Sequence, residues 1–368
     1  MIAIVYPQFY GVGGIARYLE SFLANLPKDS PSIYLITGDE HQTERRYENV
    51  KIIHIPFKSS RFHLFFWILA AHKIVKQLYA EQKINAVNLH IPPLIPGLFL
   101  PKHIPLILTA HTTYTGMSGK FYNKAYFTSQ WSDVEIALKR WMELRIFKQA
   151  AKIIALTEQG KQELLSYGID KPIVIIPNGA DLVAFTPKLH AEKIYDVLFC
   201  GRIEHRKGSR AMVEVCKNLI QQKSDIRIVI VGYGDDDVWV KHQLAPYSQN
   251  IQLTGKVVFS DTQAYYQASR LYVSTSYYEG LPGTCLEATA MGLPTIAWDF
   301  LFYRGLVVPD KTGYLIEPND SAAMAKKIVH VLNDQETYAR LAANTRPHVE
   351  AHYDWSHLSQ QILQVFEN

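Results

Sequence analysis

The sequence predicts an α/β protein made of two doubly wound units. Three observations support this: short β-branched runs alternate with longer amphipathic stretches, many of the runs are apolar at consecutive positions, and the alternation restarts midway along the chain. Consecutive apolar residues are typical of strands that are covered on both faces, as in parallel sheets. The repeated order of strand then helix indicates the helices that cover them.

Strands are expected at the short apolar runs and helices at the stretches between them. The expected strands are 2–5, 33–37, 51–55, 86–89, 106–109, 152–156, 173–176, 197–200, 227–231, 271–274, 294–297 and 313–316, with a further one at Ile251. The expected helices are 15–24, 62–80, 133–149, 158–167, 210–221, 262–268, 285–291 and 322–332. Ser132 and Glu135 have the spacing of a capping box, which places the start of the third of these helices.

A domain boundary is expected in the stretch 175–196. This stretch has no clear periodicity and contains two prolines and an Asn-Gly pair. The expected domains are residues 1–180 and 188–345, and a terminal helix of about 350–368 can pack back on the first. Both domains begin with a strand, a glycine-containing loop and a helix, which indicates two Rossmann-like units in series.

Composition excludes several classes of protein. A chain of 368 residues is long enough for two domains with full cores, and 48% hydrophobic with 20% charged residues is typical of a soluble globular protein. The formal net charge of +4 is too small and dispersed to indicate nucleic acid as a partner. It is compatible with anionic small ligands or an anionic membrane surface.

The cysteines and the apolar runs favour the cytoplasm. Three cysteines without CxxC spacing indicate neither a disulfide framework nor a zinc site, and they fit a reducing compartment. The N-terminus lacks the pattern of a signal peptide. The longest apolar run, 64–71, is far short of the roughly 20 residues that span a bilayer.

Four segments are expected at carboxyl ends of strands, where open α/β sheets bind ligands. The first, Gly11–Ala16, matches G-x-G-x-x-G/A, and acidic residues follow at 39 and 40. Three alternatives are open for this segment: it binds a dinucleotide, it forms a bare tight turn, or it is a glycine loop that faces a ligand across an interdomain cleft. The turn at Gly232–Gly234, followed by Asp235–Asp237, either ends a strand or contacts a ligand.

The other two segments carry the charges. Gly201–Gly208 contains Arg202, Arg206 and Lys207, which can clamp a diphosphate or form a solvated basic turn. In Tyr277–Pro294, the backbone N–H groups of Gly283 and Thr284 are expected at a helix start, which favours anions. Glu287 either binds a ligand or reaches back to Thr284 in a capping box. Glu279 precedes the turn, where a carboxylate contributes little to folding.

Taken together, these segments resemble the retaining glycosyltransferases of the GT-B fold, family 4. The likeness runs in order over nearly the whole chain and includes the E-x7-E pattern Glu279–Glu287, its continuation Ala288–Pro294, the pair Gly13-Gly14, His111 after a strand, the linker 176–181, and Gly201-Arg202 with Lys207-Gly208. The resemblance implies two Rossmann-like domains that face each other across a deep cleft.

The resemblance also implies the roles of individual residues. Glu279, His111, Arg202 and Lys207 are the implied catalytic residues. Arg202 and Lys207 would hold the donor diphosphate, Glu279 and His111 the sugar, and Glu287 the ribose. The implied donor-binding set is Gly13, Gly14, Gly201, Arg202, Lys207, Lys256, Val257, Glu279, Gly283, Thr284 and Glu287, with Lys256 and Val257 near the base.

One segment departs from the family pattern, and two others are candidates for the acceptor side. Where many relatives have Gly-Gly and a glutamate, this chain has Phe300–Gly305. Arg304 is therefore expected to contact a different group of the donor or the acceptor. The stretch 112–131 is long for a connection and is expected to bind the acceptor, with Tyr114, Phe121 and Tyr122 as candidates. Residues 61–76 combine aromatics with cations, which fits either a membrane contact or a buried helix.

The function implied by the resemblance is the retaining transfer of a hexose from a nucleotide-diphosphate sugar, most often UDP-linked. The acceptor is a glycan or a lipid-linked saccharide in the synthesis of cell-surface polysaccharide or glycoconjugate. No metal or true cofactor is expected, and the protein is expected in the cytoplasm or at the inner face of the membrane. Three rivals stay open: a metal-independent nucleotide-sugar 2-epimerase, an NAD-linked oxidoreductase that uses Gly11–Ala16, and a catalytically silent nucleotide-sugar-binding protein.

Overall fold

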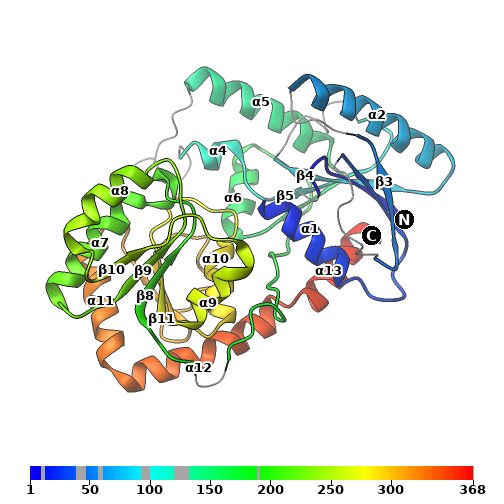
Figure 1. The fold of residues 1–368 in the computed structure, drawn as a ribbon. Coiled ribbons are helices and arrows are strands. Elements are labelled where there is room, and N and C mark those ends of the chain that lie inside the picture. Colours follow the sequence, from blue (N-terminus) through cyan, green and yellow to red (C-terminus); the bar gives the residue numbers. More distant parts are fainter. Residues whose placement is uncertain are drawn as a thin grey trace. The chain divides into compact units, whose positions relative to one another are not determined.

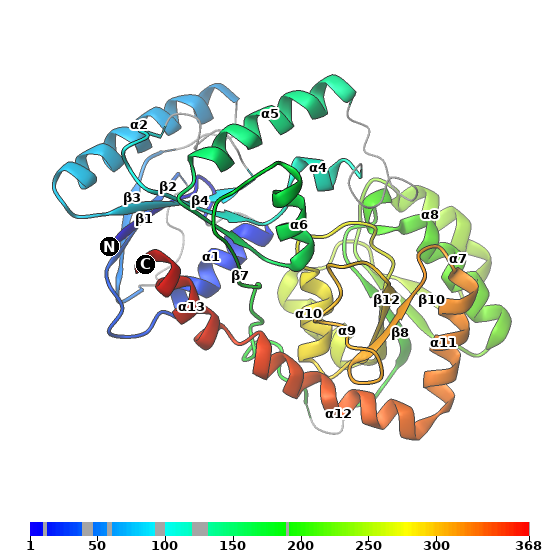
Figure 2. The same ribbon diagram turned by 180° about the vertical axis from the view of Figure 1, so that it is seen from behind.

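The computed structural model describes residues 1–9, 13–38, 47–56, 61–92, 100–119, 132–188 and 191–367 (Figures 1 and 2). The chain divides into two compact units. The first contains the described residues up to Gly179 and the C-terminal segment from Trp355, and the second contains Ala180–Asp354. The chain thus changes units at Gly179 and again at Asp354, whereas the sequence placed the end of the second domain at 345.

The first unit is built on a parallel sheet of seven strands in the order β3-β2-β1-β4-β5-β6-β7. Four of these strands are buried at every position, as expected for strands covered on both faces. The strands are β1 (Ile2–Val5), β2 (Ile33–Thr37), β3 (Val50–His54), β4 (Ala86–Ile91), β5 (Leu106–Ala110), β6 (Lys152–Ala155) and β7 (Ile173–Ile175).

Helices cover both faces of this sheet, with α1 and α13 on one face and α2 and α5 on the other (Figures 1 and 2). They are α1 (Gly14–Ala24), α2 (Arg61–Ala80), α4 (Tyr114–Met117), α5 (Asp133–Gln149), α6 (Glu158–Ser166) and α13 (Trp355–Glu367). The capping box at Ser132 and Glu135 is confirmed, because each side chain bonds to the backbone N–H of the other.

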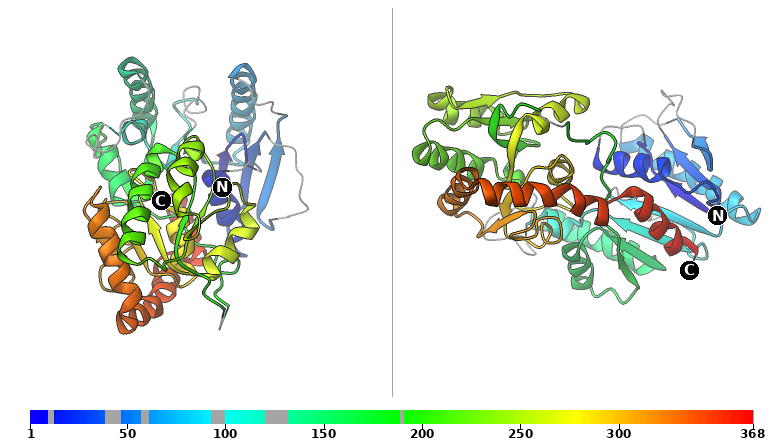
Figure 3. Two further views of the ribbon diagram at one scale, coloured as in Figure 1. Left: turned by 60° about the vertical axis from the view of Figure 1, so that its left-hand side comes forward. Right: turned by 90° about the horizontal axis from the view of Figure 1, so that it is seen from below.

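The C-terminal helix α13 packs beside α1 (Figure 3). The Phe22 and Phe366 rings meet edge to face with centroids 6.3 Å apart, and the Ser359 hydroxyl donates to the Phe22 carbonyl at 3.4 Å. A Cβ on Gly179 would lie 2.7 Å from the indole of Trp355, so the glycine allows the start of α13 to lie against the end of the first unit.

The second unit has a parallel sheet of six strands in the order β10-β9-β8-β11-β12-β13. The strands are β8 (Tyr195–Cys200), β9 (Ile228–Val231), β10 (Ile251–Leu253), β11 (Ser269–Ser274), β12 (Thr295–Trp298) and β13 (Gly313–Ile316). Its α-helices are α7 (Ser209–Gln222), α8 (Asp237–Leu244), α9 (Thr262–Gln267), α10 (Gly283–Ala290), α11 (Ser321–Asn333) and α12 (Gln335–His352). Helices α7, α8 and α11 lie on one face of the sheet and α9 and α10 on the other (Figure 1).

Helix α12 was not among the helices expected from the sequence, and Pro347 lies inside it. Proline in a helix interior removes a backbone hydrogen bond, and sequence patterns therefore favour a break at that point. Leu341, Thr345 and Val349 are buried along one side, so packing on the second unit holds the helix together through the proline.

The two sheets share one topology. In each, the first strand of the unit lies between the second and the fourth, so chain direction across the sheet reverses between β1 and β4 and between β8 and β11. This order confirms the predicted Rossmann-like, doubly wound architecture. The carboxyl ends of the strands at such a reversal leave a crevice, and ligands bind there in open α/β sheets.

Candidate active site

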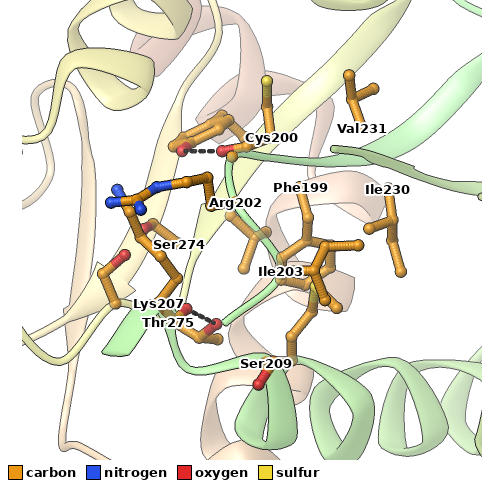
Figure 4. A pocket seen from close by; sticks show the side chains of 15 residues that line it. Phe199, Cys200, Arg202, Ile203, Lys207, Ser209, Ile230, Val231, Ser274 and Thr275 are labelled. Atoms are coloured by element: carbon orange, nitrogen blue, oxygen red, sulfur yellow. Dashed lines mark hydrogen bonds between the residues drawn. The ribbon is translucent and has the colours of Figure 1, made fainter. Parts of the chain in front are cut away.

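A pocket opens in the second unit at the reversal between β8 and β11 (Figure 4). It is formed by the ends of β8, β9 and β11 and by the loop that leads into α7. Its lining residues are Phe199, Cys200, Gly201, Arg202, Ile203, Lys207, Ser209, Met212, Ile230, Val231, Tyr272, Val273, Ser274, Thr275 and Ser276. Three residues of the predicted donor site, Gly201, Arg202 and Lys207, are therefore brought together here.

The loop that carries Lys207 is fastened to the end of β11. Thr275 donates its hydroxyl to the carbonyl oxygens of Lys207 at 3.2 Å and Gly208 at 3.1 Å. Gly208 has a left-handed backbone with φ of 70°, and a Cβ there would lie 1.9 Å from the Thr275 carbonyl oxygen. Only glycine permits this approach, which fixes Lys207 against the segment that contains Glu279.

Glu279 is buried between two cations. Its Oε1 lies 2.5 Å from Lys207 Nζ and its Oε2 lies 3.7 Å from Arg206 Nη1, while the residue is 8% exposed. Burial by itself raises the pKa of a carboxyl group, but the charges of Lys207 and Arg206 outweigh it and hold the pKa of Glu279 below its ordinary value. The site therefore keeps an ionised carboxylate out of water.

The three basic residues of this loop occupy different positions. Arg202 has a side chain that is 64% exposed and pairs with Glu204 at 3.1 Å. Arg206 is directed inward and donates to Glu204 at 2.8 Å and to the Tyr278 carbonyl at 2.9 Å. Sequence reasoning counted Arg206 among the cations that can clamp a diphosphate but left it out of the donor-binding set, and its contact with Glu279 was not expected.

Glu287 does not cap α10, so the capping-box alternative is wrong. The helix begins at Gly283 with Pro282 at its N-cap and without a side-chain cap, which places Thr284 inside the first turn. The Tyr266 hydroxyl donates to Glu287 Oε2 at 2.9 Å, and the Thr284 hydroxyl lies 2.7 Å from that of Tyr272. Two buried tyrosines, which sequence reasoning missed, therefore orient these side chains.

The start of α10 is open toward solvent at Gly283. A Cβ built on Gly283 meets nothing within 4 Å among the described residues, so no packing in that part of the chain explains the glycine. The N–H groups of a first helical turn have no partner in the helix and attract negative charge. The geometry at Gly283 and Thr284 is thus compatible with their predicted role in binding an anion.

Lys256 and Val257 follow β10, and Lys256 is exposed. Lys256 Nζ lies 5.4 Å from the centre of the Tyr233 ring, which is itself 50% exposed after β9. The pair forms a flat aromatic surface with a cation above it at the carboxyl edge of the sheet.

The segment Phe300–Gly305, which departs from the family's sequence pattern, forms a turn with packed aromatic side chains. Phe300, Phe302 and Tyr303 are buried, and the Tyr303 hydroxyl bonds to that of Ser274 at the pocket. Arg304 is exposed and makes a two-pronged contact with Asp299, at 2.9 and 3.0 Å. These bonds hold Arg304 at the surface against Asp299, which directly follows β12.

In the first unit, His111 follows β5 and meets a second histidine. Its Nε2 lies 2.9 Å from Nδ1 of His90, and the Tyr18 ring lies edge-on to His111 with centroids 4.9 Å apart. Enclosure of the ring lowers the pKa of His111 to about 3, so the imidazole is neutral. Sequence reasoning missed His90, whose signal was a second polar residue, after Asn88, in the mainly apolar run that forms β4.

The glycine loop is described from Gly13 onward, and Gly11 lies outside the described residues. Gly13 and Gly14 stand at the start of α1, and a Cβ on either would meet no described residue within 4 Å. Both positions therefore leave room for a ligand to approach the backbone.

Tyr114 begins α4, and its backbone N–H donates to Glu143 Oε1 at 2.8 Å. The neighbouring Thr113 donates its hydroxyl to Glu163 at 2.5 Å, so two buried carboxylates hold this short helix. The other acceptor candidates, Phe121 and Tyr122, lie outside the described residues.

The described part of the chain contains neither a cluster of metal ligands nor a helix that could span a membrane. Within it, no group of three or more His, Cys, Asp or Glu side chains is arranged to hold a metal ion. Among the same residues, no helix combines the length and apolar character needed to cross a bilayer.

Two doubly wound parallel sheets, one with a pocket at its topological reversal that Arg202 and Lys207 line, are the architecture of the GT-B fold. The profile of the family described as Glycosyltransferase Family 4 matches residues 12–183, and that of Glycosyl transferases group 1 matches residues 184–348. The chain belongs to this family of glycosyltransferases. Neither profile describes an epimerase or an oxidoreductase, so those two rivals are not favoured.

Individual relatives agree with this assignment. The chain is 24% identical to a 2-deoxystreptamine N-acetyl-D-glucosaminyltransferase of Niallia circulans, over 82% of each chain. It is 27% identical to a phosphatidyl-myo-inositol mannosyltransferase of Mycolicibacterium smegmatis, over 86% of this chain and 79% of the relative.

Solved structures show the same fold. The sucrose-phosphate synthase of Thermosynechococcus elongatus matches with a TM-score of 0.79 at 19% identity, over 100% of this chain and 98% of the other. The Anabaena protein HepE in complex with UDP and glucose matches with a TM-score of 0.75 at 16% identity, over 100% and 99%. The predicted fold class is confirmed.

Proposed function

We propose that this glycosyltransferase moves a hexose from a nucleotide-diphosphate sugar, with UDP favoured, to a glycan or lipid-linked acceptor with retention of anomeric configuration. The observation that carries the proposal is the ionised, buried Glu279 between Lys207 and Arg206, beside a pocket at the sheet reversal. The named relatives transfer N-acetylglucosamine or mannose, and a structural neighbour binds UDP and glucose. A role in the synthesis of cell-surface polysaccharide or glycoconjugate follows from such acceptors.

The proposal matches candidate residues to the diphosphate, the ribose, the base and the sugar of the donor. Arg202 and Lys207 line the pocket and supply cations for the diphosphate, with the N–H groups of Gly283 and Thr284 as further donors. Glu287, held by Tyr266, accepts the ribose hydroxyls. The base lies near Lys256 and Val257, and Glu279 accepts hydrogen bonds from the sugar hydroxyls.

The chemistry follows from these charges. Negative charge grows on the leaving diphosphate as the glycosidic bond breaks, and fixed cations and helix N–H groups stabilise it without reorganisation. Because the chain supplies these cations itself, we propose that transfer needs no metal ion. The acceptor attacks on the face that the diphosphate leaves, so no carboxylate has to act as nucleophile, in contrast to the paired acids of retaining hydrolases.

Contact with a membrane surface is part of the proposal for the lipid-linked acceptor. The inner side of α2 packs on the sheet through Trp67, Ile68 and Val75, while Phe65, Phe66 and Leu69 are exposed on its outer side.

Helix α5 covers the same face of the sheet (Figures 1 and 2) and exposes Val134, Leu138 and Trp141. Lys73, Lys76, Arg145 and Lys148 are exposed toward the C-terminal ends of the two helices. Apolar side chains with adjacent cations fit the anionic inner face of a cell membrane.

A thermal-shift screen with nucleotide sugars tests the donor assignment. A ligand at 100 times its dissociation constant stabilises the folded protein by about 2.7 kcal/mol. Incubation of the stabilising donor with an acceptor panel is expected to release nucleoside diphosphate and form an α-linked product from an α-linked donor. A protein that binds donors but transfers to none would instead be a silent binding protein, and interconversion of the sugar without nucleotide release would indicate the epimerase.

A further inference from the structure

We propose that His90 is a positioning residue that holds the proton of His111 on Nδ1, so that His111 faces its ligand as a neutral hydrogen-bond donor. The part played by His111 toward the sugar rests on the proposed function. The arrangement of the two rings does not, because it is set by contacts within the first unit.

The sheet brings the two histidines together. His90 is on β4, and its strand pairs in parallel with β5, so that Ile91 lies opposite Ala110. The backbone N–H of His111 donates to the Ile91 carbonyl at 3.1 Å, which extends the pairing by one residue. His90 Nδ1 and His111 Nε2 lie 2.9 Å apart, a distance at which one nitrogen must donate and the other accept.

The surroundings of His90 decide which nitrogen donates. Its second nitrogen, Nε2, is buried and has no hydrogen-bond partner among the described residues. A proton on Nε2 would leave a buried N–H donor unsatisfied, whereas a proton on Nδ1 leaves only an unused acceptor. Orphaned N–H groups are the rarer of the two in proteins, so His90 carries its proton on Nδ1 and donates to His111.

The tautomer of His111 follows directly. Because Nε2 of His111 accepts from His90, the single proton of a neutral His111 ring resides on Nδ1. That the ring is neutral follows from its enclosure: Tyr18 lies edge-on to both imidazoles, and Trp355 in turn lies edge-on to Tyr18. Among the described residues, the aromatic rings of Tyr6 and Tyr18 face the pair from the neighbouring elements.

This arrangement gives His111 a defined chemical character. A protonated His111 would direct an N–H at the N–H of His90, so the pair resists protonation. His111 is partly exposed, and among the described residues Nδ1 is the ring nitrogen left for a ligand, because Nε2 is bonded to His90. It can donate to a sugar hydroxyl or ring oxygen, but it is not arranged as a general acid or base.

The test compares His90→Asn with His90→Phe in the full-length protein. The Asn side-chain N–H₂ can replace Nδ1 as donor, whereas Phe fills the space and donates nothing. In protein labelled with ¹⁵N at histidine, the His111 signals, identified by their loss in His111→Asn, are expected to show a proton on Nδ1 in the wild type and in His90→Asn. In His90→Phe the two tautomers are expected to mix. The exposed His103, changed to Phe, is the matched control and is expected to leave these signals unchanged.

Kinetics give the second readout. His90→Phe is expected to lower kcat roughly two- to tenfold, the worth of one hydrogen bond, with the donor KM unchanged and with recovery in His90→Asn. A proton on Nε2 of His111 in the wild type would overturn the proposal, and so would an unchanged tautomer in His90→Phe. If His90→Phe does not fold, the wild-type and His90→Asn spectra still decide. If no donor supports transfer, the proposed function fails while the NMR result for the tautomer stands by itself.

Discussion

Lys207 Nζ lies 2.5 Å from Glu279 Oε1, so the cation expected to hold the donor diphosphate and the carboxylate expected to hold the donor sugar are paired with each other. In the proposed function, donor binding divides this pair: the diphosphate attracts Lys207, and the sugar hydroxyls replace the ammonium at Glu279. Arg206, 3.7 Å from the other carboxylate oxygen, remains to keep Glu279 ionised.

Lys207→Ala is expected to lower both turnover and stability. Loss of a preorganised donor at the developing charge lowers kcat by about 10²–10³. Removal of one partner from a buried ion pair costs about 3–5 kcal/mol, and the cost here is smaller because Arg206 stays near Glu279. Initial rates and denaturant unfolding measure the two effects. The double variant Lys207→Met with Glu279→Gln is expected to regain stability but not turnover; a Lys207→Ala protein that unfolds like the wild type would contradict the pairing.

Arg202→Ala is expected to lower turnover without a loss of stability. Its side chain is 64% exposed and its ion pair with Glu204 is at the surface, where such pairs contribute about 0–1 kcal/mol. If Arg202 holds the diphosphate, kcat falls by about 10²–10³. Lys241→Ala is the matched control, because Lys241 is also an exposed, ion-paired cation in the second unit. Wild-type turnover in Arg202→Ala would remove Arg202 from the donor site.

Gly283→Ala is expected to separate folding from binding. Among the described residues outside its own helix backbone, the new Cβ meets no atom within 4 Å, and alanine limits the unfolded chain more than glycine, so stability rises by about 0.4–1 kcal/mol. The same Cβ extends into the space from which a diphosphate approaches the helix start, so nucleotide affinity falls. Calorimetry with UDP and thermal melting measure the two effects, and undiminished affinity would contradict the assignment. Gly208→Ala, with a Cβ 1.9 Å from the Thr275 carbonyl oxygen, is expected to lose stability.

Glu143→Gln is expected to remove a dependence of stability on pH in the first unit. Burial raises the pKa of Glu143 to about 8, against which its bonds from Tyr167 and the Tyr114 N–H act only in part. A carboxyl group with a raised folded pKa favours folding when protonated, so its contribution is full below the unfolded value of about 4.3 and is lost as pH rises to about 8.

The measurement for Glu143 is denaturant unfolding at about pH 5 and about pH 8. The glutamine side chain of the variant is isosteric with the protonated acid, since its carbonyl can accept from Tyr114 and its amide can donate to Tyr167. The wild type is expected to lose more stability than the variant over this range. An equal loss of stability in the two proteins between these two pH values would show that Glu143 is ionised in the folded state throughout the range.

Local patterns were sufficient for most of the secondary structure. The consecutive apolar residues of β1, β2, β4 and β5 are buried at every position as expected, and the capping box at Ser132 forms as its spacing predicted. Helix α12 was missed because the sequence shows Pro347 but not the surface that holds the helix through it.

For the site too, some features could be predicted from the sequence and others only from the tertiary structure. The sequence by itself determined the doubly wound fold and the residues of the E-x7-E and Gly201–Gly208 segments, because these depend on residue type and spacing along a short stretch of chain. Only the tertiary structure decided that Glu279 pairs with Lys207, 72 positions away, that Tyr266 holds Glu287, and that His90 bonds to His111. Each of these contacts forms where neighbouring strands or helices bring distant segments together, and no periodicity in a sequence records which side chains then meet.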